Sequence, residues 1–297
     1  MLKHKKNILL LLPIIIITLT HADKTKESKI RQQHSSDFSS IVNSFMNTNN
    51  KLKEKTNLAG KQRMLTQRIT KLALLIDANI KIKQNTKKLD KATNAYAKNL
   101  DLLKSKDSKI TEQLKIIQKR WTPFHKNINN IIQKKEKEKS ISYLMEHNEE
   151  LLKNSNTLVT IYETSDSHLN YLDQAKLYIV NLAGRQRMLL EKMSKEKILL
   201  FKKNDTYTNK LKTSMSDFES ALHVLRAGNH DQHVPSVSNP KLKEKLNIIE
   251  ALWKKLKPLY EKNNLTKKEL STLIRQSSLL LLESNIYVKL TELEIEY

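Results

Sequence analysis

The chain is 297 residues long and carries a formal net charge of +23 at pH 7. It contains no cysteine, which excludes disulfides, lipid attachment at a cysteine and covalent haem attachment. With three glycines, five prolines and 5% aromatic residues, its composition is typical of a helical protein rather than a β protein.

The first 22 residues have the pattern of a secretory signal peptide. Three lysines precede an apolar run at 8–19, and Thr20-His21-Ala22 fits a cleavage site with small residues. The run is short for a membrane span, which needs about 20 apolar residues. We therefore expect a signal peptide at 1–22, a periplasmic location and no later membrane span. An uncleaved membrane anchor is the alternative.

The positive charge does not indicate a nucleic-acid-binding protein. The lysines are scattered along the chain and do not form a stripe interleaved with aromatic residues. Export would also separate the protein from nucleic acid, so we expect no nucleic-acid partner. A basic surface would still raise the local concentration of small anions.

The first half of the chain predicts a bundle of four helices. Residues 23–34 are polar and are expected to be disordered. From Ser35 to Ile76, apolar residues recur at spacings of three, four and seven, which predicts one long amphipathic helix. Further helices are predicted at 86–104, at 109–135 and from 141 onward. Within the third, Pro123 should kink the helix or end its first part.

The second half repeats this order. No glycine or proline occurs between 126 and 183, so the fourth helix is expected to run almost without interruption into the fifth. A helix at 207–227, a loop at 228–239 and two more helices follow. Asn239 with Pro240 marks the start of one of them, and Thr266 with Glu269 marks the start of the last.

The fold class predicted is therefore all-α, with two tandem antiparallel four-helix bundles at 35–165 and 166–297. A long, continuous helix would join them. Four helices are the minimum for such a bundle. Trp121 and Trp253 occupy matching places in the two halves and are expected in the bundle cores.

A fifteen-residue segment occurs twice, at 57–71 and at 181–195. The two copies read N-L-A-G-K-Q-R-M-L-T-Q-R-I-T-K and N-L-A-G-R-Q-R-M-L-L-E-K-M-S-K, with nine identical positions at an offset of 124. Repetition at this distance indicates two copies of one structural unit.

The repeated segments concentrate two rare residue types. Gly60 and Gly184 are two of only three glycines, and a glycine inside a helix costs about 1 kcal/mol relative to alanine. Four of the eight arginines also fall in these segments, although the chain otherwise uses lysine. A glycine allows close approach of a ligand or helix, and arginine binds oxyanions with a planar pair of donors.

Arg63 and Arg187 are thus the primary candidates for anion binding, beside Gly60 and Gly184. Two such helices brought together would set two guanidinium groups around a gap that an anion could fill. The secondary candidates are Gln67, Arg68 and Arg185. In the alternative interpretation, the arginines pair with carboxylates on helix surfaces and the glycines only permit tight packing.

The segment N-L-A-G-x-Q-R-M-L resembles the signature helix of the NarX, NarQ and PilJ family of periplasmic sensor domains. The resemblance covers about 35–297 as two copies. It implies a four-helix bundle that dimerises through its first helix. It also implies that the motif arginine, here Arg63 and Arg187, binds an oxyanion at the interface. Whether the copies pair within one chain or between two stays open.

The resulting hypothesis is a periplasmic sensor or binding protein for a small oxyanion, such as nitrate or nitrite, acting with a membrane histidine kinase or chemoreceptor. The alternative is a ligand-free helical module associated with a chemoreceptor, a kinase or a type IV pilus system. No catalytic motif is present, so we expect neither an enzyme nor a cofactor. One cluster consists of His223, His230, Asp231 and His233, of which the last three lie in a loop. It has no counterpart in the first copy, and we expect no metal there.

Overall fold

The computed structural model describes residues 24–165, 170–231 and 233–293, with side chains from residue 51 to 292 apart from the same gaps. The expected signal peptide lies outside these residues. The chain divides into two compact units, 1–48 and 49–297, and the second unit holds both bundles.

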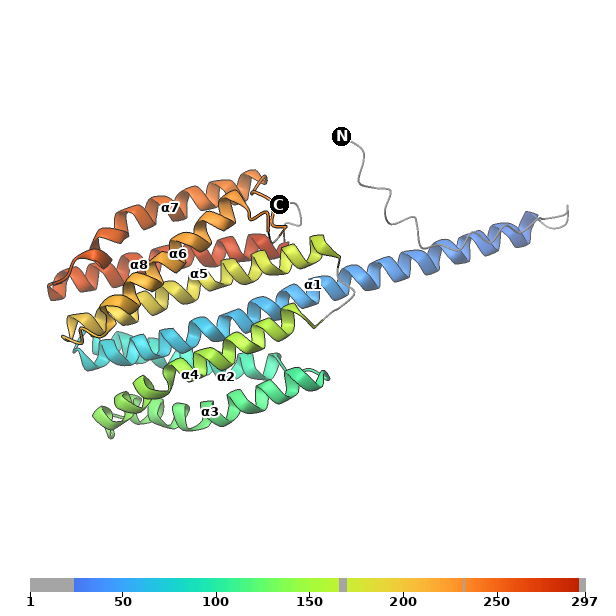
Figure 1. Cartoon of the computed structure of the whole chain (residues 1–297). Coiled ribbons are helices and arrows are strands. Elements are labelled where there is room, and N and C mark those ends of the chain that lie inside the picture. The colour runs from blue at the N-terminus through green and yellow to red at the C-terminus, as the bar shows by residue number, and fades with distance from the viewer. Residues whose placement is uncertain (1–23, 166–169, 232, 294–297) are drawn as a thin grey trace. The chain divides into compact units, whose positions relative to one another are not determined.

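Within the described residues the structure contains eight α-helices and no strand. The first four are α1 (Lys24–Asp77), α2 (Ile82–Leu102), α3 (Ser108–Ile132) and α4 (Lys137–Glu163). The last four are α5 (Tyr171–Phe201), α6 (Tyr207–Ala227), α7 (Pro240–Glu261) and α8 (Lys267–Leu293). Each set forms a four-helix bundle, α1 contributing from residue 49 onward (Figure 1). The predicted all-α class and the two tandem bundles are confirmed.

The first helix begins earlier than the sequence pattern indicates. α1 starts at Lys24, inside the segment 23–34 for which we expect disorder. No glycine or proline interrupts residues 24–34, so nothing local ends the helix there.

The expected continuous helix between the two bundles is wrong. α4 ends at Glu163, where Thr164 caps it, and α5 begins at Tyr171. The side chain of Asn170 accepts a hydrogen bond from the backbone N–H of Asp173 at 2.9 Å. An asparagine N-cap starts a new helix without help from glycine or proline, which is why the break escapes a search for those two residues.

Pro123 does not end the third helix. α3 continues through it to Ile132. A proline removes one backbone donor inside a helix. The side-chain amide of Asn127 also donates to the Pro123 carbonyl at 2.9 Å. This bond does not replace the one that the Lys119 carbonyl loses, so the helix tolerates one missing donor.

The bundle cores match the expectations for the two tryptophans. Trp121 is buried and stacks on Tyr96, with ring centroids 4.1 Å apart. Trp253 is buried against Phe218 at 4.6 Å. The two bundles therefore share one internal plan, in which an aromatic residue of the second helix packs on the tryptophan of the third.

The predicted caps of the last two helices are also present. Asn239 accepts hydrogen bonds from the backbone N–H groups of Lys241 and Leu242. Thr266 and Glu269 form a reciprocal capping box, with backbone N–H donors at 2.8 and 3.2 Å from the partner side chain.

α1 and α5 run side by side, parallel and in register, at the junction of the two bundles (Figure 1). Their contacts join residues 118, 123 and 125 positions apart, close to the repeat offset, from the Arg63–Asn181 bond at one end to the Asp77–Lys202 pair at the other. Each helix thus faces its own counterpart, so the two copies pair within one chain.

Candidate functional site

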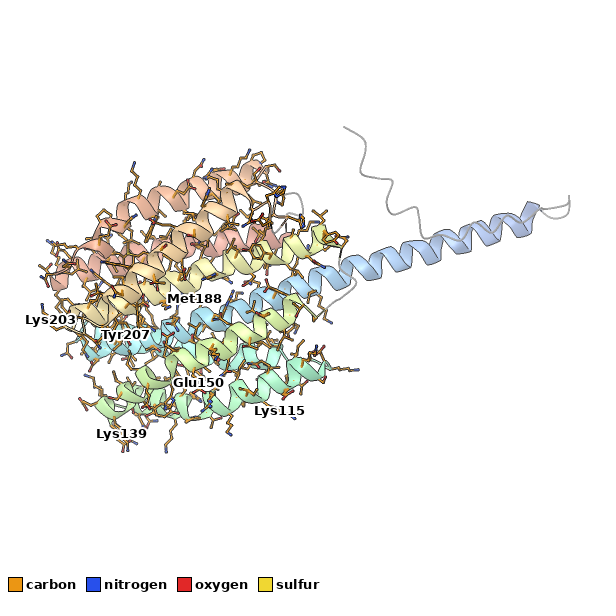
Figure 2. All side chains as sticks on the ribbon, in the orientation of Figure 1. Lys115, Lys139, Glu150, Met188, Lys203 and Tyr207 are labelled. Atoms are coloured by element: carbon orange, nitrogen blue, oxygen red, sulfur yellow. The ribbon has the colours of Figure 1, made fainter. Side chains whose placement is uncertain are left out.

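The repeated segments lie where α1 and α5 meet, and both are buried on almost every side. In α5 every residue from Gln186 to Leu199, a run that starts inside the second copy, is buried except Lys192. Met188, labelled on α5 in Figure 2, belongs to this run. The sequence places the glycine–arginine side off the apolar seam of each helix. The structure buries that side as well, because the motif helix of the other bundle covers it.

The structure brings Gly60, Gly184, Arg63 and Arg187 together. A Cβ atom built on Gly60 would lie 3.3 Å from Nη2 of Arg63 and 3.7 Å from Nη2 of Arg187. A Cβ on Gly184 would lie 3.3 Å from Nη2 of Arg187 and 3.4 Å from Nη2 of Arg63. Both guanidinium groups therefore lie over both glycines, in space that a larger residue would restrict.

Each arginine reaches across to the other copy. Arg63 Nη2 donates to the backbone carbonyl of Asn181 at 3.2 Å. Arg187 Nη2 donates to the side-chain oxygen of Asn57 at 2.6 Å, and its Nη1 donates to Asn285 at 3.4 Å. Asn57 and Asn181 are the first residues of the two repeats, so the crossing contacts follow the internal symmetry.

These hydrogen bonds leave the positive charges without a direct counter-charge. Arg63 is 4% exposed and Arg187 1%, yet neither guanidinium forms an ion pair with a carboxylate among the described residues. The Nε atoms of both are buried and have no hydrogen-bond partner in that part of the chain. The alternative of surface arginines paired to carboxylates is therefore wrong.

Burial and mutual repulsion weaken the charged forms of both arginines. Burial lowers the pKa of Arg63 to about 10, against a partial compensation from Glu163. Burial also lowers the pKa of Arg187 to about 9, and the charge of Arg63 adds to this effect. Both remain cationic at neutral pH, and a bound anion would favour the charged forms.

Two carboxylates lie near the arginines without pairing with them directly. Burial raises the pKa of Glu163 to about 7, despite a hydrogen bond from Asn181 and the attraction of Arg63. Glu292 of α8 accepts a hydrogen bond from the Asn57 amide, and Asn57 in turn accepts from Arg187. Charge at this site thus depends on one group that titrates near neutral pH.

The secondary candidates do not join the arginine pair. Arg185 is 45% exposed and forms an ion pair with Asp217 at 3.0 Å. Arg68 donates its Nε–H to Glu191 at 2.7 Å. Gln67 is fully buried and donates to Asn148 at 3.1 Å.

Gln67 and Arg68 instead belong to a second polar layer further along the two motif helices. Glu191 is buried and accepts from Arg68 and from the buried Lys71. Lys195 is buried and donates to Asn148 and Glu149, both at 2.7 Å. Each charged group in this layer has a direct partner of opposite sign, in contrast to the arginine pair.

Sequence reasoning missed Asn57, Asn181, Glu163, Asn285 and Glu292. The two asparagines carried a signal, since they are identical in both copies and start the repeat. The other three lie on the fourth helix of a bundle, outside any motif, and only the packing of α4 and α8 brings them near the arginines.

Other chemistry is not apparent in the described residues. No group of three or more histidine, aspartate or glutamate side chains there is placed to hold a metal ion. Within the same residues, no helix combines the length and hydropathy needed to span a membrane.

The fold and the crossed arginines define a duplicated helical-bundle module. A family model described as "Type IV pili methyl-accepting chemotaxis transducer N-term" matches residues 44–144 and 168–277, one segment in each bundle. The chain belongs to this family, here in two tandem copies. The family serves signalling and chemotaxis and is not a family of enzymes. No curated protein and no solved structure matches the chain.

Proposed function

We propose that this chain senses a small oxyanion, such as nitrate or nitrite, held between Arg63 and Arg187. The sensor would act in the periplasm and signal to a membrane histidine kinase or chemoreceptor. One observation supports the proposal: two buried guanidinium groups lie over the same two glycines, and no carboxylate in the described part of the chain pairs directly with either of them.

An anion at this point satisfies what the protein leaves unsatisfied. Among the described residues the two Nε–H groups have no acceptor, and charge-assisted hydrogen bonds to an oxyanion are among the stronger polar contacts. An oxyanion also removes the repulsion between two like charges in a medium of low polarity. The bare backbone at Gly60 and Gly184 gives the guanidinium groups room to turn toward it.

Binding would then change how α1 and α5 pack. Without the anion the two cations repel at the level of residues 60–63 and 184–187, while the ion pairs of Glu191 with Arg68 and Lys71 hold the helices together further along. With the anion bound, each guanidinium is attracted to the anion, and this attraction replaces the repulsion at residues 60–63 and 184–187 only. A ligand shifts an equilibrium by its differential affinity for the two states, and this arrangement supplies such a difference.

The resemblance implies a site between two chains, but here both arginines come from one chain. Isothermal titration with nitrate, nitrite, sulfate and chloride, on protein whose oligomeric state is measured in parallel, tests the proposal. We expect saturable binding of one oxyanion per chain. Half an anion per chain would contradict an intramolecular site, and no heat with any anion would contradict the binding itself.

The affinity for the anion should depend on pH through Glu163. When Glu163 loses its proton, a negative charge appears near Arg63 and opposes an entering anion. Since the pKa of Glu163 is raised to about 7, we expect affinity to rise as pH falls through that value.

Glu163→Gln should bind the anion as the protonated form does and show little dependence between pH 6 and 8 (about one unit either side of this pKa). Glu150→Gln, on the same helix but half exposed and paired with Arg120, is the matched control. Identical pH profiles for Glu163→Gln and the unmodified protein would rule out this role.

The second candidate is a ligand-free interaction module within the same signalling systems. The observation that favours it is an exposed apolar stripe on α8, formed by Leu279, Leu282 and Ile286. Such a stripe is typical of a protein contact surface. Loss of receptor association on changing this stripe, together with no response to any oxyanion, would favour this candidate.

A further inference from the structure

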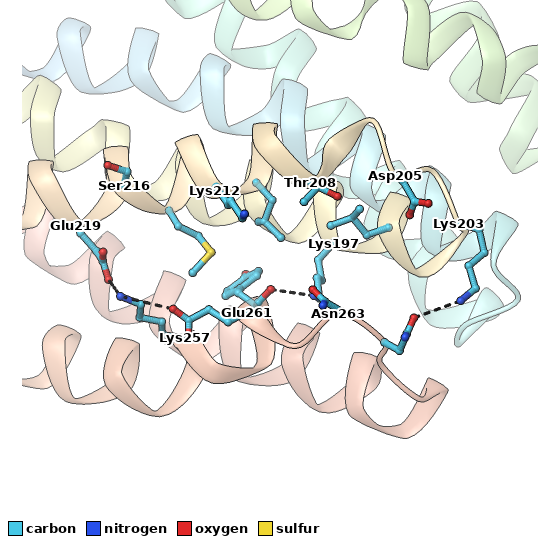
Figure 3. A pocket seen from close by; sticks show the side chains of 15 residues that line it. Lys197, Lys203, Asp205, Thr208, Lys212, Ser216, Glu219, Lys257, Glu261 and Asn263 are labelled. Carbon is cyan, nitrogen blue, oxygen red and sulfur yellow. Dashed lines mark hydrogen bonds and ion pairs between the residues drawn. The ribbon is translucent and has the colours of Figure 1, made fainter.

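A cavity of about 660 Å³ lies in the second bundle, away from the two arginines. It is bordered by the end of α5, by α6 and by α7 (Figure 3). α6 packs chiefly on α5 and α7 packs chiefly on α8, which leaves this space between them. Its volume falls in the range of about 300–1,000 Å³ that is usual for small-molecule sites.

The cavity has an apolar wall. Leu211 and Met215 of α6 and Tyr260 of α7 are buried, and Leu200 of α5 is half-buried beside them. Hydrocarbon in contact with this wall would leave water, which favours binding by about 25 cal/mol per Å².

A buried lysine lines the cavity. Lys197 is 2% exposed, and its Nζ donates to the backbone carbonyls of Tyr260, at 2.9 Å, and Lys262. These carbonyls belong to the end of α7, so the lysine also caps that helix. An ammonium group has three donors, and these carbonyls use two of them.

No carboxylate neutralises Lys197 among the described residues. Burial alone lowers its pKa to about 8, with no charged group contributing. By contrast, Lys257 at the edge of the cavity lies between Glu219, at 2.7 Å, and Glu261, at 3.8 Å (Figure 3). Four lysines and three acidic residues line the cavity in total, so its net charge is positive. Among these lysines, Lys197 is the buried one.

The first bundle shows that the fold does not need a lysine here. At the repeat offset of 124 the counterpart of Lys197 is Ala73, which is 1% exposed in the core of the first bundle. The flanking positions Lys71 and Lys195 are unchanged. The second copy therefore carries a buried charge at a position that alanine fills in the first.

We propose that this cavity binds a small amphipathic carboxylate. Its charged end accepts a hydrogen bond from Lys197, and its hydrocarbon part packs on Leu200, Leu211 and Met215. Lys212, an exposed residue of α6 on the cavity wall with no ion pair among the described residues, adds attraction near the opening. The site is separate from the oxyanion site and does not depend on it.

Methionine methyl NMR on the full chain tests this site directly. Met215 reports on the cavity, whereas Met64 and Met188 report on the paired motif helices. We expect sodium hexanoate to shift the Met215 signal saturably in the millimolar range, while sodium chloride at equal ionic strength does not. An unmoved Met215 signal would overturn the proposal, whatever nitrate does to Met64 and Met188.

Lys197→Met separates the role of the charge from that of the cavity shape. We expect this variant to bind hexanoate at least about tenfold more weakly, the usual effect of losing a hydrogen bond to a charged group. Binding of hexanol, which has the same chain but no charge, should change little. The control is Lys255→Met, since Lys255 is an exposed residue of α7 outside the cavity. This substitution should leave the binding of hexanoate and of hexanol unchanged.

A variant of the exposed Lys212 covers the case in which Lys197→Met does not fold. Lys212→Ala removes only a surface charge, and we expect it to weaken hexanoate more than hexanol. Equal losses for hexanoate and hexanol in Lys197→Met would overturn the assignment of the carboxylate to this lysine. If that variant does not fold, unchanged hexanoate binding in Lys212→Ala would overturn the proposal that lysines of this cavity attract the carboxylate.

Discussion

Glu191→Gln is expected to lower the free energy of unfolding by about 3–5 kcal/mol, the usual cost of breaking a buried ion pair on one side. Glu191 is 1% exposed and accepts from Arg68 and Lys71, and Lys71 is itself 6% exposed. Without the carboxylate, Lys71 remains buried with no counter-charge. The substitution fits the space, since glutamine occupies the matching position of the first copy, Gln67.

Chemical denaturation of both proteins at neutral pH measures this loss. The control is Glu250→Gln, in which the lost partner of Arg226 is 40% exposed. Exposed ion pairs contribute about 0–1 kcal/mol, so this control should change little. Equal effects of the two substitutions would show that the buried layer does not hold the motif helices together.

The loss of stability caused by Glu191→Gln should depend on pH in a definite direction. Burial would raise the pKa of Glu191, but the charges of Lys71 and Arg68 outweigh burial and lower it. A carboxylate with a lowered pKa stabilises the folded state above its usual pKa, and this stabilisation is lost as pH falls through the lowered value. The difference between Glu191→Gln and the unmodified protein should therefore shrink in acid.

The second large effect concerns nitrate and the melting temperature. At a free concentration 100 times the dissociation constant, a ligand of the native state stabilises it by about 2.7 kcal/mol. Arg187→Met removes the donors of one guanidinium and should weaken binding by tenfold to a hundredfold, on the order of one charge-assisted contact. If binding is weakened a hundredfold, the same nitrate concentration equals the new dissociation constant. Nitrate then stabilises the native state of the variant by only about 0.4 kcal/mol, so its melting temperature should rise much less.

Arg185→Met is the matched control, because Arg185 lies two residues away in the same motif. It is 45% exposed and pairs with Asp217, so its loss should leave the nitrate response intact. Each variant is compared with itself in sodium chloride of equal ionic strength, which removes any effect of the substitution on stability alone. A full nitrate response in Arg187→Met, or its loss in Arg185→Met, would contradict the proposed site.

Much of the fold could be predicted from apolar spacing and capping residues. The helix at 207–227 and the caps at Asn239 and Thr266 depend only on neighbours in sequence, and all are confirmed. The misses at Pro123 and at the α4–α5 junction have different causes. α3 tolerates the missing backbone donor of Pro123 inside the helix, whereas an asparagine cap, rather than a glycine or proline, starts α5. This chain rarely uses glycine or proline to end helices, and several turns place other residues at positive φ, among them Lys81, Lys134, Glu136 and Lys203.

The arginines and glycines of the site could be found because the repeat singles them out. Their burial could not be predicted. The apolar spacing along a helix shows which side faces its own bundle, but it does not show what covers the opposite side. The same holds for Glu163 and Glu292, which reach the site through packing between helices far apart in sequence. The function proposed for these residues remains a prediction.

The parallel pairing of α1 with α5 inside one chain has an evolutionary consequence. In an assembly of identical subunits, any substitution appears on both sides of the axis at once. Here a covalent tether keeps the halves at a high effective concentration, so each can change alone. Glu191 opposite Arg68, and Lys197 where the first half has Ala73, are changes of this kind. The two halves of this pair are therefore free to differ in sequence, and at these positions they do.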